Sequence, residues 1–149
     1  MNCIRLCWTV VVLLLAGSMA PFEAFGQTAE AKALPSLIEM DSQVELRQPG
    51  PHDGGGETTG YSFFTDAPDL GLVFRKRALH PGAAIGYHPH AGDEIYYVLS
   101  GTGELTLNGD TSAVSPGTAI LTRAGSSHGL RQTGKDDLVI IIVYGKGEP

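Results

Sequence analysis

Apolar and polar residues alternate in short runs along much of the chain beyond residue 60, and this pattern predicts β-strands. Residues 61–65 and 71–79 are rich in aromatic and β-branched side chains, and Asp66-Ala67-Pro68-Asp69 between them predicts a turn. Asn108-Gly109 separates two further alternating segments and predicts a tight hairpin. No amphipathic helix pattern appears after residue 26. The predicted fold class is therefore all-β.

Residues 95–100 alternate clearly enough to predict which side chains face the interior. If Glu94 begins this strand on the inner face, Tyr96 and Val98 follow it there, because side chains on a strand repeat their direction every second residue. Three apolar residues then form the opposite face: Ile95, Tyr97 and Leu99.

Residues 138–144 are apolar on both faces of the expected strand. An antiparallel sheet with one solvated face should alternate here, so a second layer should cover the outer face. We expect that layer to be a second copy of the chain, which makes the protein a homodimer. The outward residues Ile95, Tyr97 and Leu99 would contribute to the same interface.

The first 26 residues have the pattern of a secretory signal peptide. Arg5 supplies a positive charge, residues 6–16 form an apolar run, and Ala24-Phe25-Gly26 offers small residues before a cleavage point. The run is too short to span a bilayer comfortably, and a retained anchor is the alternative. Cys3 and Cys7 both lie in this leader, so the mature chain would contain no disulfide or thiolate ligand. The pattern predicts a secreted or periplasmic protein without membrane attachment after cleavage.

Charge and breaker residues indicate the organisation of the remaining chain. The formal net charge of −6 argues against nucleic acid or an anionic membrane as a partner. Residues 27–58 are expected to form an N-terminal arm and a flexible loop, because proline and glycine cluster over residues 49–56. We interpret His52, within this loop, as a solvated residue, with a lid residue or accessory metal ligand as the alternative. Residues 59–149 would form the single folded domain.

A cluster of candidate metal ligands lies between the predicted strands. His88 and His90 share one strand face, roughly 7 Å apart along the chain. A short turn follows, and it lets Glu94 return to the same face with a carboxylate oxygen. His128 is the candidate for a fourth ligand from a distant segment. Imidazoles and a carboxylate at this spacing predict a site for a divalent metal.

These residues and their spacing resemble the two signatures of the cupin superfamily. The first signature is met in full by Gly82, His88, His90, Glu94 and Gly101. The second is met by Gly117, Gly125 and His128, but Arg123 stands where proline is usual and Gln132 stands where asparagine is usual. The resemblance implies a double-stranded β-helix, a cupin jelly-roll barrel at residues 59–149 whose interior holds the metal.

The resemblance implies one divalent transition metal bound by His88, His90, Glu94 and His128. Three neutral imidazoles and one carboxylate give a site with a net charge of +1 and, on an octahedral ion, two adjacent open positions. Mn, Fe, Ni and Co suit that geometry, with Mn or Fe favoured, while Zn and Cu stay open as alternatives.

Several nearby residues are candidates for contacts with a small-molecule ligand. Arg75 or Arg77 could point inward and bind a carboxylate, or the basic run could be solvated. Tyr96 could orient a ligand or donate a proton, or simply fill the core. Glu94 could also accept a proton, and Gln132 falls on the inner face in phase with His128.

The resemblance leaves catalysis open. The first hypothesis is a secreted metal-dependent enzyme, of the dioxygenase, oxidase or decarboxylase type, acting on a small organic acid or an oxygenated aromatic. The alternative is a non-catalytic cupin that binds a metal or small ligand, and a third is a structural interaction module. A two-domain oxalate decarboxylase and a plant-type germin are disfavoured, because one cupin unit is present and the mature chain would lack a disulfide.

Overall fold

A computed structural model describes residues 33–147 of the chain. The predicted signal peptide, with both cysteines, lies outside the described residues, so it stays a prediction. Within residues 33–147, no helix has the length and apolar character that crossing a membrane requires.

The described residues contain one short helix and ten strands, in agreement with the predicted all-β class. The helix is α1 (Asp41–Val44). The strands are β1 (Glu45–Pro49), β2 (Glu57–Phe63), β3 (Leu72–Leu79), β4 (Ala84–Pro89), β5 (Glu94–Ser100), β6 (Gly103–Leu107), β7 (Asp110–Val114), β8 (Ala119–Thr122), β9 (Ser127–Gln132) and β10 (Leu138–Gly145).

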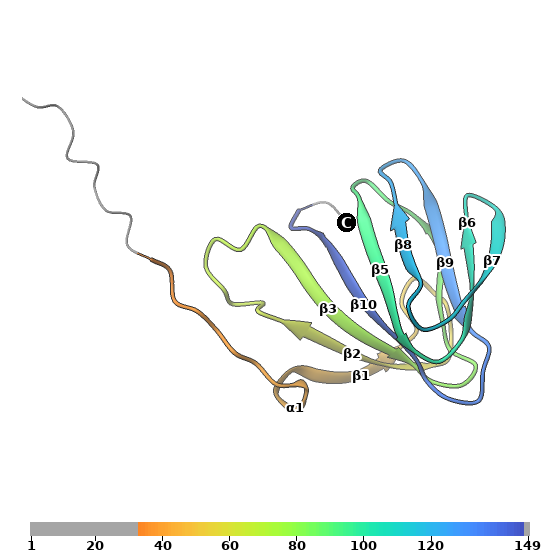
Figure 1. The fold of residues 1–149 in the computed structure, drawn as a ribbon, viewed down its shortest axis with the longest axis horizontal. Coiled ribbons are helices and arrows are strands. Elements are labelled where there is room, and N and C mark those ends of the chain that lie inside the picture. The colour runs from red at the N-terminus through yellow and green to blue at the C-terminus, as the bar shows by residue number, and fades with distance from the viewer. Residues whose placement is uncertain (1–32, 148–149) are drawn as a thin grey trace, which may run out of the picture. The chain divides into compact units, whose positions relative to one another are not determined.

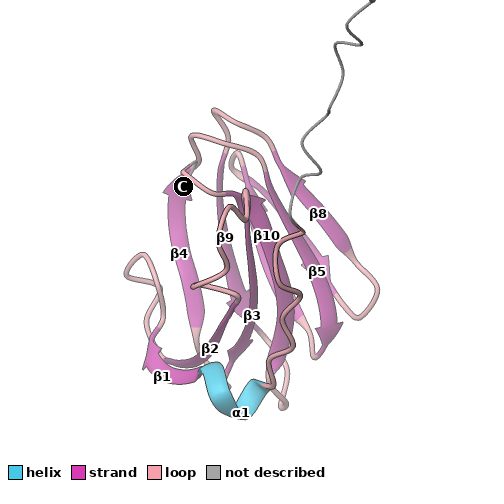
Figure 2. Ribbon diagram, turned by 90° about the vertical axis from the view of Figure 1, so that its left-hand side faces the viewer, coloured by secondary structure: helices cyan, strands magenta, loops and turns pink. Residues whose placement is uncertain are grey.

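The strands form two antiparallel sheets that face each other as a jelly roll. The larger sheet has the order β1-β2-β3-β10-β5-β8, which can be followed across Figure 1. The smaller sheet has the order β4-β9-β6-β7. Figure 2 shows β4 and β9 side by side, the pair that carries the histidines. The core lies between the sheets, and this arrangement is the predicted double-stranded β-helix.

The side chains of β5 alternate between the buried and the exposed face of the sheet, as the sequence predicted. Along β5, Tyr96 and Val98 are buried while Ile95, Tyr97 and Leu99 are exposed. Leu130 of β9 is buried in the same core as Ile140 of β10. The apolar contacts between these facing strands hold the two sheets together.

Two turns show how local sequence closes the barrel. Asn108 and Gly109 join β6 to β7 with φ values of 52° and 93°, the positive φ pair of a type I′ hairpin. The turn before β9 forms although Arg123 replaces the usual proline, because the Ser126 amide donates to the Arg123 carbonyl at 2.9 Å. The departure at Arg123 therefore leaves this loop closed.

Part of the segment expected to be an arm and loop belongs to the larger sheet. β1 pairs with β2 from Glu45 opposite Tyr61 to Pro49 opposite Glu57. β2 starts at Glu57, earlier than the expected strand at residue 61, because this pairing extends it. The glycine-rich loop between β1 and β2 consequently starts and ends on the sheet.

Candidate metal centre

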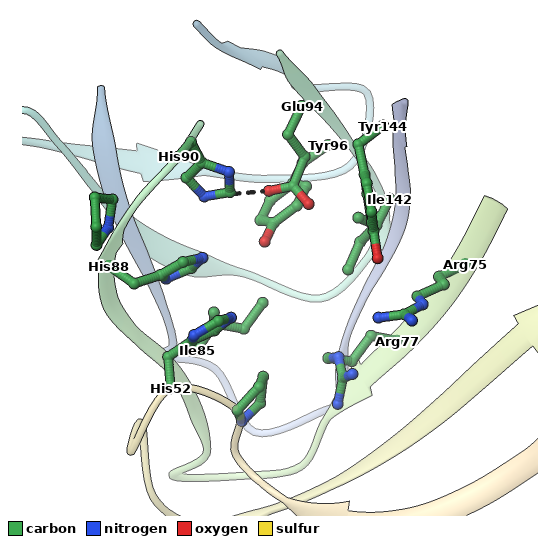
Figure 3. A pocket seen from close by; sticks show the side chains of 12 residues that line it. His52, Arg75, Arg77, Ile85, His88, His90, Glu94, Tyr96, Ile142 and Tyr144 are labelled. Carbon is green, nitrogen blue, oxygen red and sulfur yellow. Dashed lines mark ion pairs between the residues drawn. The ribbon is translucent and has the colours of Figure 1, made fainter. Parts of the chain in front are cut away.

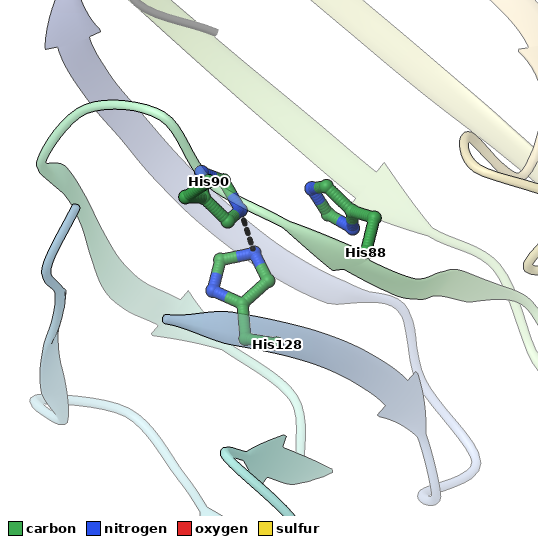
Figure 4. Close-up of side chains that lie close together, drawn as sticks. All are labelled: His88, His90 and His128. Carbon is green, nitrogen blue, oxygen red and sulfur yellow. Dashed lines mark hydrogen bonds between the residues drawn. The ribbon is translucent and has the colours of Figure 1, made fainter. Parts of the chain in front are cut away.

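Three histidines converge between β4 and β9. His88 on β4 is the cross-strand partner of His128 on β9, and His90 follows directly after β4 ends. One nitrogen from each ring lies within 4.8 Å of the others, and Figure 4 shows the rings pointing toward a common centre. The His90 backbone is fixed as well, since its amide donates to the Ser126 carbonyl at 2.9 Å. The structure therefore brings together the three histidines that the sequence selected.

The second nitrogens of two rings are already bound, which leaves their Nε2 atoms for an ion. His88 Nδ1 donates to the Gly86 carbonyl at 2.7 Å. His128 Nδ1 lies 2.6 Å from the Thr122 hydroxyl. Such bonds set the tautomer and ring orientation of metal-binding histidines. These two contacts therefore fix the orientation of the His88 and His128 rings.

Glu94 extends the histidine group from β5. Its Oε2 atom lies 3.5 Å from His90 Nε2 and 3.4 Å from His128 Nε2. This oxygen is buried and has no hydrogen-bond partner among residues 33–147. A buried carboxylate oxygen without a donor is costly unless a cation compensates it. The donor set therefore fits a divalent metal held by three imidazoles and one carboxylate.

The pKa values of these groups follow from burial. Desolvation raises the pKa of Glu94 to about 7, against the opposing effects of Tyr96 and Arg75. Desolvation lowers the pKa of His128 to about 3, with smaller contributions from His90 and His88. The pKa of His90 is lowered as well, first by burial and then by His88. Neutral imidazoles are the form that binds metals, so the lowered pKa values of His90 and His128 favour their role as ligands.

A cavity of about 140 Å³ opens beside the histidines. Two arginines of β3, Arg75 and Arg77, enter it from the side opposite to His88 and His90, as Figure 3 shows. Both arginines line the cavity, whereas the sequence left open whether one of them points inward or the basic run is solvated. Apolar and aromatic residues complete the wall: Pro51, Ile85, Tyr96, Ile142 and Tyr144.

The two guanidinium groups are held differently. Arg77 is 7% exposed and donates through Nη1 to the Thr58 hydroxyl at 2.9 Å. The Gln48 amide, with its oxygen turned toward Arg77, accepts from Nη1 at 3.0 Å and from Nη2 at 3.2 Å. Burial lowers the Arg77 pKa. Arg75 lies over the Tyr144 ring, 5.7 Å from its centroid, and its buried Nε has no partner in the described chain. Neither arginine forms an ion pair with a carboxylate of residues 33–147.

The other two predicted contact residues lie in contrasting places. Tyr96 lines the cavity, and its hydroxyl lies 3.1 Å from His128 Nε2. Burial and the Glu94 charge raise the Tyr96 pKa. Gln132 is buried but does not line the cavity, because its amide binds three backbone groups, those of Gly82, Gly134 and Asp136. The pairing of its amide with the neighbouring turns sets Gln132 apart from the candidate site.

His52 lines the cavity although the sequence favoured a solvated loop residue. Its outer side is exposed, but its ring stacks on the ring of His88 with 3.5 Å between centroids and 6° between planes. Burial and the neighbouring His88 lower the His52 pKa. The glycines that follow His52 were the sequence feature that could have indicated this packing, because glycine permits close contact between backbones as well as flexibility.

Comparison with known proteins places the fold and the site in a family. Residues 76–144 match the family described as Cupin domain, and this range contains all four predicted ligands. An oxalate-binding protein of Thermotoga maritima is 38% identical over 72 residues, which cover 48% of this chain and 60% of that protein. A 5-nitrosalicylic acid 1,2-dioxygenase of a Bradyrhizobium species is 30% identical over 91 residues, covering 61% of this chain and 42% of the enzyme.

A solved structure extends the comparison beyond the matched sequence segment. The crystal structure of a predicted oxalate decarboxylase from Thermotoga maritima superposes with a TM-score of 0.68 and 29% identity, covering 73% of this chain and 98% of the other. The matched segment begins within β3 and ends within β10, so it includes both walls of the cavity except Arg75 and the loop that carries His52. Because its sequence matches the cupin domain family and its two sheets superpose on this solved structure, the chain belongs to the cupin superfamily.

Proposed function

We propose that this protein is a metal-dependent enzyme that binds a small organic acid and oxidises or decarboxylates it. In this proposal, His88, His90, His128 and Glu94 hold one divalent ion, with Mn or Fe favoured. A bound ion of this kind would supply Lewis-acid and redox chemistry to a carboxylate at its open positions.

The observation that carries the proposal is the pair of arginines opposite the histidines, buried Arg77 and half-buried Arg75. A buried guanidinium without an acidic partner is costly, and a ligand carboxylate would compensate it. Arginine also matches the planar geometry of a carboxylate, because two parallel N–H groups can donate to its two oxygens. Arg75, whose Nε has no partner within residues 33–147, is available for this contact.

The size of the cavity favours a small acid over an oxygenated aromatic. Its volume of about 140 Å³ is well below the roughly 300–1,000 Å³ typical of sites for drug-sized ligands. The names of an oxalate-binding relative and a predicted oxalate decarboxylase support the same substrate class. Oxalate is therefore the first acid to test.

Two residues of β5, Glu94 and Tyr96, have roles in the proposed reaction. The Glu94 carboxylate, the anionic ligand in this proposal, can accept a proton when it moves away from the ion. Tyr96, whose hydroxyl contacts His128 Nε2, lines the same cavity and can orient the acid. Gln132 is left out of this proposal, because its amide already binds the neighbouring turns.

A second candidate is a binding protein that holds the metal and the acid without turnover. The pairing of Tyr96 with His128 and its raised pKa favour this candidate, since they make Tyr96 a poor proton donor. The relative named as an oxalate-binding protein also supports it.

Turnover of oxalate by metal-loaded protein separates the two candidates. Protein loaded with Mn(II) or Fe(II) is mixed with oxalate in air, and formate, CO₂, hydrogen peroxide and dioxygen uptake are measured beside calorimetric binding. Decarboxylation yields formate and CO₂, whereas oxidation yields CO₂ and hydrogen peroxide from dioxygen. Binding without product supports the second candidate, and absence of binding in the metal-loaded protein contradicts both. The His128→Ala variant, which lacks one ligand, controls for chemistry by free metal.

We also propose that the protein is a homodimer built through the outer face of the larger sheet. Ile95, Tyr97, Leu99 and Leu121 are 44% to 49% exposed there. Ile95 pairs across the strands with Leu121 of β8 and Val143 of β10, so these side chains form one apolar surface. Light scattering on the purified protein should give twice the chain mass, and Tyr97→Lys with Leu121→Lys should give one chain mass. A wild-type monomer would contradict this proposal.

Export to the periplasm or the medium completes the proposal. It depends on the predicted signal peptide at residues 1–26. The N-terminal sequence of protein recovered from those compartments should begin near Gln27. A chain that keeps its first residues there would contradict cleavage.

A further inference from the structure

The loop that carries His52 has a defined and unusual backbone. His52 and Asp53 both have positive φ angles, 53° and 58°, and the Gly54 amide donates to the Pro51 carbonyl at 3.1 Å. These are the φ angles and the hydrogen bond of a type I′ turn. Residues other than glycine adopt this conformation at an energetic cost, which the surrounding contacts have to offset.

Backbone contacts with β4 and within the loop hold it in place. The Gly86 amide donates to the Pro51 carbonyl at 2.9 Å, and the Ala84 amide donates to the Gly55 carbonyl at 3.1 Å. The approach is so close that a Cβ atom at Gly86 would lie 1.8 Å from the His52 carbonyl oxygen. The glycine at position 86 therefore permits this packing, and the loop forms a fixed wall of the cavity.

One residue of β4, Gly86, contacts both the loop and the candidate ligand His88. Gly86 binds the loop through its amide and binds His88 Nδ1 through its carbonyl. The His52 ring then covers one face of the His88 ring, as Figure 3 shows, at a centroid distance of 3.5 Å and an interplanar angle of 6°. The His88 imidazole is thus held both at Nδ1 and across its face.

We propose that His52 is a positioning residue that orients His88 for metal binding. The inference rests on the metal site of the proposed function and is independent of the substrate and the reaction. Stacking limits rotation of the His88 ring, so that its Nε2 stays directed at the centre of the histidine group. His52 acts through the ring face, and its own nitrogens are not required.

The geometry argues against His52 as a further ligand. Nitrogen lone pairs lie in the plane of an imidazole ring, and metal–nitrogen distances are about 2.0–2.1 Å. The lone pairs of two stacked rings with 3.5 Å between centroids lie in two nearly parallel planes, so they do not converge on one ion. The group whose ligand atoms lie close together contains His88, His90 and His128 without His52.

Two substitutions separate the ring of His52 from its nitrogens. His52→Asn removes the ring, keeps polar atoms and suits a positive φ angle. His52→Phe keeps a stacking ring but has no nitrogen donor. Loss of a residue that orients a metal ligand typically weakens metal binding by 10- to 100-fold, so His52→Asn should bind Co(II) at least about tenfold more weakly. His52→Phe should bind nearly as tightly as the wild type.

The test measures Co(II) affinity by competition with a chelator, together with the visible absorption spectrum of the bound ion. Tyr87→Ala is the matched control, because it removes an exposed aromatic ring next to His88 on β4. The spectrum should change for His52→Asn and stay unchanged for His52→Phe and Tyr87→Ala. Thermal unfolding of each metal-free variant shows whether it is folded.

Each result has a definite meaning. Wild-type affinity in His52→Asn overturns the inference and leaves the proposed metal site standing. Equal weakening in His52→Asn and folded His52→Phe overturns the positioning role and makes the His52 nitrogens the cause. A wild-type protein that binds no Co(II), Mn(II) or Fe(II) removes the proposed function and this inference together.

Discussion

The cavity has two walls whose side chains are held in place in different ways. We call them the histidine wall (His88, His90, His128 and Glu94) and the arginine wall (Arg75 and Arg77). On the histidine wall, His88 and His90 lie two residues apart, and both second-nitrogen contacts come from residues close in sequence to their histidine, Gly86 to His88 and Thr122 to His128. On the arginine wall, Arg77 is held by Thr58 of β2 and Gln48 of β1. The contacts that orient the histidine rings are therefore local in sequence, although the pairing of β4 with β9 brings His128 to His88, whereas the contacts that hold Arg77 come from two other strands.

The walls also differ in how their charges are compensated. The histidine wall offers ring nitrogens and a carboxylate oxygen without a hydrogen-bond partner in the described residues, and a cation would satisfy it. The arginine wall holds two guanidinium groups without a carboxylate partner in the described residues, and an anion would satisfy it. A metal with a bound acid anion would complete both walls. Changes on one wall should therefore affect the metal, and changes on the other should affect the acid.

The largest effect is expected when the histidine wall is broken. His128→Ala should weaken Mn(II) or Fe(II) binding by more than the roughly 100-fold that removing a partner of a metal ligand costs, because a ligand itself is lost. Metal analysis of purified protein and chelator competition measure the effect. His80→Gln is the matched control, since His80 pairs with Thr59 and Asp137 outside the cavity. Equal metal content in His128→Ala and the wild type would contradict the ligand assignment.

A smaller effect is expected when the arginine wall is broken. Arg75→Gln should leave the metal affinity unchanged and weaken oxalate binding by about 2 kcal/mol, or roughly 30-fold, because one charge-assisted contact is lost. Calorimetry on the metal-loaded protein measures both constants. Lys76→Gln is the matched control, as Lys76 lies on the same strand but pairs with Asp41 and covers the Tyr61 ring. Weakening of the metal instead of the acid would show that the walls are not separable.

The contrast between the walls also explains what the sequence could predict. The spacing of His88 and His90 and the phase of β5 are local, so these two ligands and the inward position of Tyr96 could be predicted directly, whereas His128 was a candidate from a distant segment. Arg75 and Arg77 could be named as candidates, but their joint entry into the cavity depends on the pairing of β3 with β2 and β10.

Two residues have contacts that the sequence did not indicate, because their partners come from elsewhere in the fold. Gln132 has the inward phase that the sequence predicted, yet three backbone groups of the neighbouring turns use its amide. His52 belongs to a loop that the sequence treats as flexible, because the close approach at Gly86 depends on how the loop packs against β4. The pattern of a single sequence predicts which strand residues face inward, but it does not predict how a loop packs against the rest of the fold.

The smallest effect concerns pH, and it tests whether Glu94 belongs to the histidine wall. Its pKa of about 7 means that an ion must displace a proton from the carboxyl at acid pH. Through this group, the metal affinity should fall by up to about tenfold for each pH unit below 7 and level off above it. Glu94→Gln, which cannot ionise, should bind more weakly and lose this component of the pH dependence. Chelator competition between pH 5.5 and pH 8, in the same buffers for both proteins, measures the metal affinity of the wild type and of Glu94→Gln as a function of pH.

The folding stability of the metal-free protein provides an internal check, because the Glu94 contribution to it should fall as pH rises, whereas the metal affinity should increase. Burial raises the Glu94 pKa from its ordinary value of 4.5 to about 7, so the folded chain binds this proton more tightly than the unfolded chain. The resulting stabilisation is complete below pH 4.5 and is lost as pH rises through 7. The unfolding temperature of wild type relative to Glu94→Gln should therefore fall between pH 5 and pH 8 without metal. Added Mn(II) should reduce or reverse that trend, because it stabilises the ionised carboxylate that burial disfavours. Parallel curves for the two proteins, with and without Mn(II), would place Glu94 outside the metal site and leave the three histidines as its protein ligands.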